Sequence, residues 1–301
     1  MSFPLVPRGR LVGLSFGTMR SLRRGTGSDV AGARFYQAGD DVHAIDWAAS
    51  ARLSSARASD EFIVREHYAD EAPRVLIVCD RRPEMSFYRA PLPWVDKAEA
   101  MRQAAELILE SASLVGGFVG YLDHGDGQPY WVPPRGVRRL WELTTDRLPS
   151  GAFSAPPDTL ELAFAHLTEH RRSVAAGSFV FCLSDFIPMP PDEVWLWAAQ
   201  ESRWDVVPVV IQDPTWEQSF PDVGGIEVPL RNPRTGRGNP IRLTRREASE
   251  RRRANEERLA RLIERFRALD IEPVVVSSND RAEILGSFLE WAEVRLTRRA
   301  A

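Results

Sequence analysis

The sequence predicts an α/β fold with a doubly wound, mostly parallel sheet. Short apolar runs that each end in an acidic residue recur along the chain, and segments with helical spacing of apolar residues separate them. Strands that alternate with helices form parallel sheets, whose ligands bind beyond the carboxyl ends of the strands. The four runs are RVLIVCD (74–80), SFVFCLSD (178–185), DVVPVVIQD (205–213) and EPVVVSSND (272–280).

Residues 1–72 differ in texture from the rest of the chain and are predicted to form an N-terminal segment that packs on the core. The first 29 residues are rich in arginine and are interrupted by Gly25 and Gly27, which favours a loop or a short hairpin. Residues 61–68 alternate between apolar and polar side chains, as a half-buried strand does.

The core domain is predicted to span residues 73–298. Residues 118–134 are typical of a hairpin with Asp126 and Gly127 at its turn. Residues 214–244, rich in Pro, Gly and Arg, are too many for a crossover loop and predict an inserted arm or small hairpin beside the sheet. Apolar periodicity predicts helices at 96–115, 137–146, 158–172, 192–202, 245–269 and 280–296.

The composition is that of an ordinary globular protein. The chain has 301 residues, 44% apolar and 27% charged, and its net charge of −3 gives no overall drive toward nucleic acid. Lys97 is the only lysine among 39 basic residues, a bias attributed to genome composition. The two cysteines lie in apolar runs, and no run reaches the roughly 18 apolar residues of a membrane helix. The expected location is the cytoplasm.

The motifs of common enzymes are missing from the sequence, so we expect no catalytic residues and no enzyme. There is no P-loop, no dinucleotide-binding glycine motif after the first strand, and no Gly-x-Ser-x-Gly elbow. His166 and His170 sit one helical turn apart with Glu169 beside them, a spacing that can place two metal ligands on one face. We expect them to be polar flanks of a helix.

The segment GDDVHAIDW, residues 39–47, gathers three aspartates beside aromatic and arginine residues. Such aspartates either pair with nearby arginines and fix a loop, or form a docking surface for a basic partner. Trp47 is expected to pack against the fold. The candidate binding residues are Arg34, Tyr36, Asp40, Asp41, Asp46, Trp47 and Arg52.

These residues carry a resemblance to a known family. RFYQAGDDVHAIDWAASAR, residues 34–52, resembles the pattern Arg-x-Tyr-x-x-Gly-Asp-Asp-x-Arg-x-Ile-Asp-Trp-x-Ala-x-Ala-Arg of a bacterial family of domains of unknown function, number fifty-eight. His43 replaces the usual Arg, while SDF at 184–186 and RNPRTGR at 231–237 also fit. The family is similar to von Willebrand factor A domains, and its genes often neighbour those of MoxR-type AAA+ ATPases. The resemblance implies a protein-interaction or adaptor role beside such an ATPase.

The resemblance also implies a degenerate metal-ion-dependent adhesion site. The usual site has the form Asp-x-Ser-x-Ser, completed by a Thr and a second Asp, and it binds Mg²⁺. A guanidinium cannot ligate a metal, so we expect no metal and no cofactor here; Mg²⁺ would bind only if the altered site still held it. The matching crevice residues are Asp80, Arg82 and Glu84 at the first strand, then Thr159, Ser184 and Asp185.

The role of the arginines after the first strand stays open between two hypotheses. In the first, Arg82 or Arg81 takes the place of the cation and bridges Asp80 to Asp185. In the second, Arg82 points into solvent, as arginine commonly does.

Two other functions remain as alternatives to an adaptor. The first is an Mg²⁺-dependent hydrolase that uses the crevice carboxylates Asp80, Asp185 and Asp213. The second is nucleic-acid binding through the arginine-rich segments 1–24 and 245–267, although the second segment also carries many glutamates, as a solvated helix face does.

Overall fold

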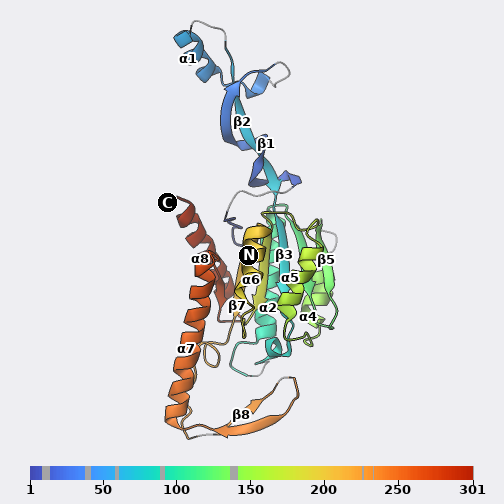
Figure 1. Ribbon diagram of the computed structural model, residues 1–301, viewed down its shortest axis with the longest axis vertical. Helices are drawn as coiled ribbons and strands as arrows, with labels where there is room; N and C mark the ends of the chain where they lie inside the picture. The colour runs from blue at the N-terminus through green and yellow to red at the C-terminus, as the bar shows by residue number, and fades with distance from the viewer. Residues whose placement is uncertain are drawn as a thin grey trace.

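The computed structural model describes residues 1–8, 14–37, 42–57, 61–88, 92–135, 142–225, 227–232 and 234–300. At its centre is a six-stranded sheet of order β10-β7-β6-β3-β4-β5 (Figure 1). All neighbouring strands are parallel except β4 and β5, so the predicted mostly parallel sheet is confirmed. The strands are β3 (Arg74–Cys79), β4 (Phe118–Asp123), β5 (Tyr130–Arg135), β6 (Phe179–Ser184), β7 (Asp205–Ile211) and β10 (Val274–Val276).

Helices cover both faces of this sheet. Helices α2 (Lys97–Leu114) and α8 (Arg281–Ala300) share one hydrophobic cluster with the sheet. Helices α5 (Thr159–Glu169), α6 (Asp192–Leu196) and α7 (Arg245–Ala268) share a second cluster with the opposite face. The short helical turns are η2 (Pro83–Ser86), η4 (Leu143–Arg147), α4 (Leu148–Ser150) and η5 (Trp197–Glu201). Half of the helix predicted over 137–146 lies outside the described ranges, and its last four residues belong to η4.

Helix α2 shows how the sequence sets these elements. Asp96 caps it by accepting a hydrogen bond from the backbone N–H of Glu99 at 3.1 Å, which satisfies a donor that the helix cannot. The predicted apolar stripe faces the sheet, because all its members are buried: Met101, Ala104, Ala105, Ile108, Leu109 and Ala112. Lys97 is the first residue of this helix and lies at the carboxyl edge of the sheet.

An arm projects from the amino edge of the sheet (top of Figure 1). It consists of the antiparallel strands β1 (Leu14–Phe35) and β2 (Ile63–Ala72), with the turn η1 (Val42–Ala44) and helix α1 (Trp47–Arg57) at its end. The loop or short hairpin predicted for the first 29 residues is wrong for Leu14 onward, which is strand. The glycines that suggested a break instead coincide with shifts in register, such as that between Gly25 and Val30.

A second, smaller hairpin lies at the other end of the molecule, where the sequence predicted an insertion. Strands β8 (Glu227–Arg231) and β9 (Gly238–Arg242) pair antiparallel, just before α7 begins (bottom of Figure 1). Among the described residues, no helix combines the length and the apolar character needed to cross a membrane.

Candidate functional site

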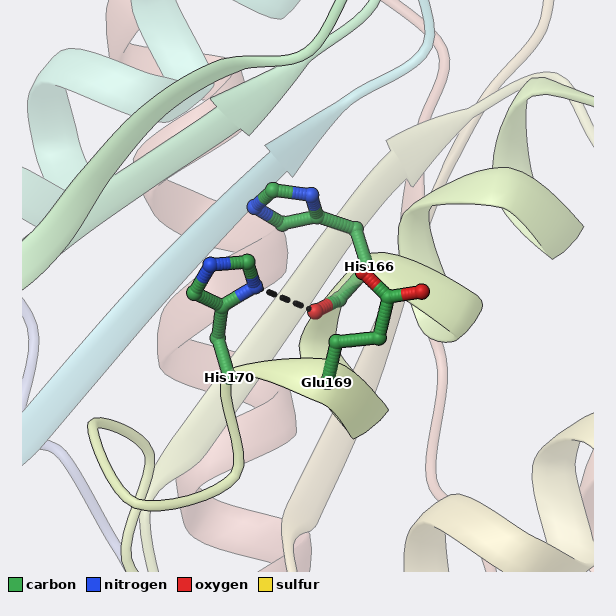
Figure 2. A group of neighbouring side chains, drawn as sticks. All are labelled: His166, Glu169 and His170. Carbon is green, nitrogen blue, oxygen red and sulfur yellow. Dashed lines mark hydrogen bonds between the residues drawn. The ribbon is translucent and has the colours of Figure 1, made fainter.

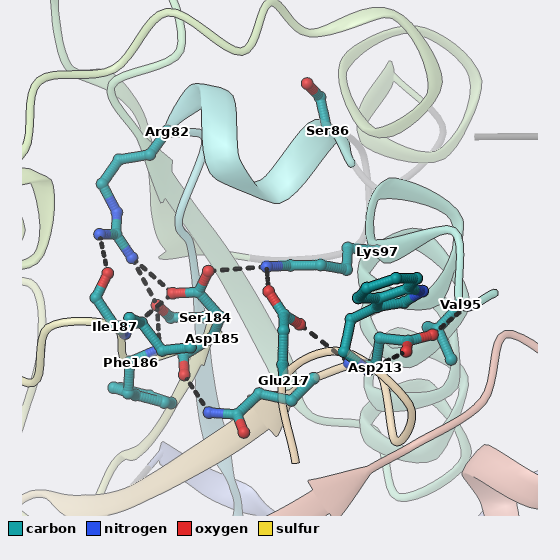
Figure 3. A network of polar contacts seen from close by, with 12 residues as sticks. Arg82, Ser86, Val95, Lys97, Ser184, Asp185, Phe186, Ile187, Asp213 and Glu217 are labelled. Atoms are coloured by element: carbon teal, nitrogen blue, oxygen red, sulfur yellow. Dashed lines mark hydrogen bonds and ion pairs between the residues drawn. The ribbon is translucent and has the colours of Figure 1, made fainter. Parts of the chain in front are cut away.

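A buried network of ion pairs lies at the carboxyl ends of β3 and β6 (Figure 3). Asp80 follows β3 directly, and Asp185 follows β6. Both carboxylates are essentially inaccessible to solvent. Ionised carboxylates at such a position require cations or several hydrogen bonds, because burial alone strongly disfavours the charge.

Arg82 supplies one of these cations. Its Nη2 lies 2.5 Å from Asp80 Oδ2 and 2.8 Å from Asp185 Oδ1, and its Nε also donates to Asp80. Nη1 donates to the carbonyl oxygen of Ile187 at 2.8 Å. Burial alone would lower the pKa of Arg82, but the hydrogen bond and charge of Asp80 and the charge of Asp185 raise it. The predicted bridge is confirmed for Arg82, and the solvent-facing alternative is wrong.

Lys97 supplies the second cation. Its Nζ donates to Asp185 Oδ2 and to Glu217 Oε1, both at 2.7 Å, and the side chain is fully buried. Burial would lower the pKa of Lys97, but the two carboxylates raise it above its ordinary value. Asp185 responds in the opposite sense: burial would raise its pKa, yet Lys97 and Arg82 hold it below the ordinary value. The solitary lysine of the chain is thus a specific ion-pair partner.

Glu217 is the least compensated member of the network. Its pKa is raised, because its burial and the nearby charge of Asp185 outweigh the attraction of Lys97. Its other oxygen accepts the backbone N–H of Asp213 at 2.9 Å, which ties the residues after β7 to the network. Neither Lys97 nor Glu217 was predicted from the sequence as a site residue. The one signal in the sequence was that Lys97 is the only lysine of the chain and stands at the start of a predicted helix.

Aromatic side chains from the segment before α2 lie against this network. Tyr88 contacts Trp94, with ring centroids 5.9 Å apart, and Trp94 contacts Trp216 at 5.2 Å. Burial and the nearby charge of Glu217 raise the pKa of the Tyr88 phenol, which keeps it neutral. The charged groups of the network are themselves buried, so they interact in a medium of lower dielectric constant than water.

Arg81 points away from the network and performs a separate structural task. Its Nε donates to Asp123 Oδ2 at 3.1 Å, and its Nη1 donates to the carbonyl oxygen of Gly151 at 2.8 Å. A Cβ at Gly151 would lie 2.5 Å from the guanidinium carbon of Arg81, so only glycine fits there. Arg81 therefore joins the end of β4 to Gly151, the residue that follows α4, and it is not the bridging arginine.

Of the remaining predicted crevice residues, one belongs to the network and the others lie around it. Ser184 does belong to it, because its hydroxyl donates to Asp80 Oδ2 at 2.6 Å. Glu84 instead pairs with Arg234 of the β8–β9 hairpin at 3.0 Å. Thr159 is buried at the start of α5 and makes no side-chain hydrogen bond to the network within the described ranges. Asp213 caps a turn, accepting backbone N–H groups of Val95, Thr215 and Trp216.

The donors of this crevice do not fit an Mg²⁺ ion. Mg²⁺ requires about six oxygen ligands near 2.1 Å, some of them water. Here the guanidinium of Arg82 lies between the two aspartates, and the ammonium of Lys97 holds the other oxygen of Asp185. Two fixed cations therefore neutralise the carboxylates that a metal would use.

The predicted binding residues at the arm form a different kind of site. Asp46 caps α1 by accepting the N–H of Ala49 at 3.0 Å, and its other oxygen pairs with Arg65 Nε at 2.8 Å. The hydrogen bond from Arg65 lowers the pKa of Asp46. The predicted neighbours donate to backbone instead: Arg34 to the carbonyl of Phe35 and Arg52 to that of Ala48. Asp40 and Asp41 lie outside the described residues.

Three aromatic side chains are exposed at this end of the arm. Trp47 is 59% exposed, Phe62 41% and Tyr36 37%. Phe62 lies between the other two, with ring centroids 5.8 Å from Trp47 and 6.5 Å from Tyr36. The expectation that Trp47 packs into the fold is therefore wrong, since its aromatic contact is a T-shaped one with the partly exposed Phe62. We call Tyr36, Trp47 and Phe62 the arm-tip patch.

Helix α7, the second arginine-rich segment, packs on the sheet as its stripe predicted. Leu262 and Phe266 are buried against the core. Several of its arginines pair with acids, such as Arg265 with Asp192 at 2.5 Å and Arg246 with Glu250 at 2.8 Å. Arginines committed to such pairs leave less positive charge for a polyanion.

The fold and the crevice together define an α/β protein whose sheet edge is closed by buried ion pairs. The chain belongs to the DUF58 family, described as proteins of unknown function, whose model matches residues 32–261. That range includes the arm-tip patch, the crevice and the β8–β9 hairpin. The family predicted from the motif at residues 34–52 is confirmed.

Relatives with curated sequences occur in mycobacteria. Uncharacterized proteins of Mycobacterium bovis and Mycobacterium tuberculosis are 29% identical over 223 residues, which cover 74% of this chain and 66% of each relative. The chain thus spans just under two thirds of their length. A crystal structure of an uncharacterized membrane spanning protein from Vibrio fischeri is 17% identical and covers 75% of this chain and 96% of that one. Its TM-score of 0.23 is too low to support an argument.

Proposed function

We propose that this protein is a non-enzymatic interaction module that acts as an adaptor for a MoxR-type AAA+ ATPase. The observation that carries the proposal is the arm-tip patch, where Tyr36, Trp47 and Phe62 are exposed together. Grouped apolar side chains on a protein surface commonly mark interaction sites, and aromatic residues contribute most of the binding energy there. The ATPase is the partner that the family resemblance implies.

The arm is suited to present this patch. Strand β2 has 10 residues, and a strand of that length spans about 33 Å. Pro73 alone separates β2 from β3, the central strand that ends at the ion-pair network. A partner can therefore bind the end of the arm without approaching the sheet.

The chemistry of the crevice supports a role without catalysis. A hydrolase that used Asp80, Asp185 and Asp213 would need carboxylate oxygens free for metal or water. Arg82 and Lys97 hold those of the first two, and backbone N–H groups hold those of Asp213. Calorimetry should give no saturable Mg²⁺ binding. Tight binding that Asp80→Ala abolished, or phosphatase activity in Mn²⁺ that Asp185→Asn abolished, would favour the hydrolase instead.

Binding to the immobilised ATPase tests the proposal. The immobilised ATPase should retain the full chain. A variant with both Trp47→Ala and Phe62→Ala should bind at least tenfold more weakly, while its circular dichroism spectrum stays unchanged. Leu296→Ala, at an exposed apolar side chain of α8, is the matched control and should bind as the native chain does. Equal retention of all three proteins would refute the role of the patch.

Two further experiments address the alternatives that the sequence left open. If the acids of the motif dock a basic surface of the partner, then Asp40→Ala with Asp41→Ala should weaken retention steeply at low salt. If the arginine-rich segments bind nucleic acid, the full chain should bind duplex DNA with an affinity that falls steeply with salt. We expect no such DNA binding.

A further inference from the structure

Two imidazole rings lie side by side at the end of α5 (Figure 2). His166 is in the last turn of the helix and His170 is its C-cap residue. Their ring centroids are 4.1 Å apart and the ring planes differ by 21°. Side chains four residues apart lie on one face of a helix, and paired histidines at this spacing are a common metal chelate.

The tautomer of His170 is set by its local contact. Its Nδ1 lies 2.9 Å from the carbonyl oxygen of His166. A carbonyl oxygen can only accept, so Nδ1 carries the proton and the lone pair is on Nε2. Histidines that bind metals are oriented in the same way, by donating the second ring N–H to a carbonyl or a carboxylate.

One ring nitrogen of His166 has no hydrogen-bond partner among the residues that the structure describes. Within the described ranges, Nε2 of His166 is buried and makes no hydrogen bond. A buried polar atom without a partner is unfavourable, and such atoms in a native structure call for an explanation. Trp131 of β5 restricts both rings, because its ring centroid lies 5.4 Å from that of His166 and 5.8 Å from that of His170.

Glu169 adds a carboxylate beside the two rings. One ligand atom from each of His166, Glu169 and His170 lies within 4.8 Å of the others. Ligand atoms around Zn²⁺, bound at 2.0–2.1 Å, are about 3.3 Å apart in a tetrahedral site. Side-chain rotations that bring Nε2 of His170 and the other two ligand atoms to that spacing would close the cluster around an ion.

We propose that His166, Glu169 and His170 bind a late first-row transition-metal ion such as Zn²⁺, with water completing the coordination. Two imidazoles and one carboxylate favour Zn²⁺, Ni²⁺ or Cu²⁺ over Mg²⁺, which takes oxygen ligands. This site is separate from the crevice and does not depend on the adaptor role. The bound ion would fix the end of α5 in place beside Trp131.

Titration of the metal-free full chain with Zn²⁺, followed by calorimetry, tests the proposal, and Co²⁺ provides an absorption spectrum of the same site. The native chain should bind one ion. His166→Ala and His170→Ala should each weaken binding at least tenfold, and Glu169→Gln should weaken it less. His43→Ala, which removes an exposed histidine of the arm, is the matched control and should leave the affinity unchanged.

Binding of less than one ion, or unchanged affinity after His166→Ala and His170→Ala together, would overturn the proposal. If these variants do not fold, nuclear magnetic resonance of the native chain tests the proposal instead. Zn²⁺ should then shift the ring signals of two of the five histidines of the native chain. Glu169 is exposed, so Glu169→Gln should fold normally, and the same ring signals should then need a higher Zn²⁺ concentration to shift. Shifts at other histidines, or none, would exclude the site.

Discussion

The crevice and the arm tip are opposites in their physical chemistry, although one strand path connects them. The crevice is buried, charged and internally paired, with Arg82 and Lys97 held among three carboxylates. The arm tip is exposed and aromatic, and it lies beyond the opposite edge of the sheet. The residues that the family resemblance assigns to a metal site thus form ion pairs within the chain. The apolar surface suited to binding another protein lies at the end of the arm, away from the sheet.

Under the proposed function, stability resides in one region and partner binding in the other. Charges in the crevice have lost their water and depend on one another, so removing one leaves its partner uncompensated. Aromatic side chains at the arm tip have kept much of their exposure, so removing one changes little within the chain. Substitutions in the two regions should therefore differ by a measurable amount in unfolding free energy.

Replacing the solitary lysine should have the largest effect on stability. Lys97→Met keeps the apolar stem but removes the charge that Asp185 and Glu217 share. Loss of one partner of a buried ion pair costs about 3–5 kcal/mol of unfolding free energy. Urea unfolding followed by circular dichroism measures this loss.

The matched control is Arg246→Met, which removes an exposed ion pair on α7. Exposed pairs contribute about 0–1 kcal/mol, so the control should unfold close to the native chain. If Lys97→Met were no more destabilising than Arg246→Met, the buried network would not be a main source of the stability of the fold.

The pH dependence of stability should report Asp185. Because its pKa is lower in the folded chain than in the unfolded chain, its stabilising contribution is complete above pH about 4, the range of an unfolded Asp. That contribution is lost as the pH falls through the folded pKa, with a slope of at most about 1.4 kcal/mol per pH unit for one group. Unfolding titrations between pH 5 and pH 2 should be shallower for Asp185→Asn. An equal slope in both proteins would contradict the assignment.

Removing the ion pair between the β8–β9 hairpin and the crevice edge should lower the unfolding free energy only slightly. Arg234 and Glu84 form a partly exposed bidentate pair, at 3.0 and 3.1 Å, between the β8–β9 hairpin and η2. Arg234→Ala should therefore lower the unfolding free energy by no more than about 1 kcal/mol. A loss as large as that of Lys97→Met would extend the network to the hairpin.

The smallest effect on stability is expected at the arm tip. Trp47→Ala removes an exposed ring whose aromatic contact is a T-shaped one with Phe62. Surface substitutions change stability by about 0.5 kcal/mol or less. Thermal unfolding of the variant checks this, and a large loss would mean that the ring supports the arm rather than a partner.

The sheet and the crevice were predictable where the information is local. The apolar runs ending at Asp80 and Asp185 predicted buried strands, and parallel strands bring their carboxyl ends together. Arg82 is two residues from Asp80, so a bridge to Asp185 could be proposed from chain order and chemistry alone.

The features that escaped prediction depend on distant contacts. Glu217 lies 120 residues from Lys97, and no local pattern pairs a helix-start lysine with an acid in an inserted segment. The length of β1 was hidden because its glycines and arginines indicate a turn, whereas pairing with β2 holds it extended. Trp47 was expected inside because large apolar residues usually are, and only the geometry of the arm exposes it.

The affinity of a MoxR-type ATPase, the proposed partner, for three chains tests the central claim most directly. Calorimetry should compare the native chain with Trp47→Ala at the arm tip and Arg234→Ala at the crevice edge. Trp47→Ala should weaken binding at least tenfold, and Arg234→Ala should leave it within twofold of native. Binding that Arg234→Ala weakened and Trp47→Ala did not would contradict the account, because the crevice edge would then be the binding surface.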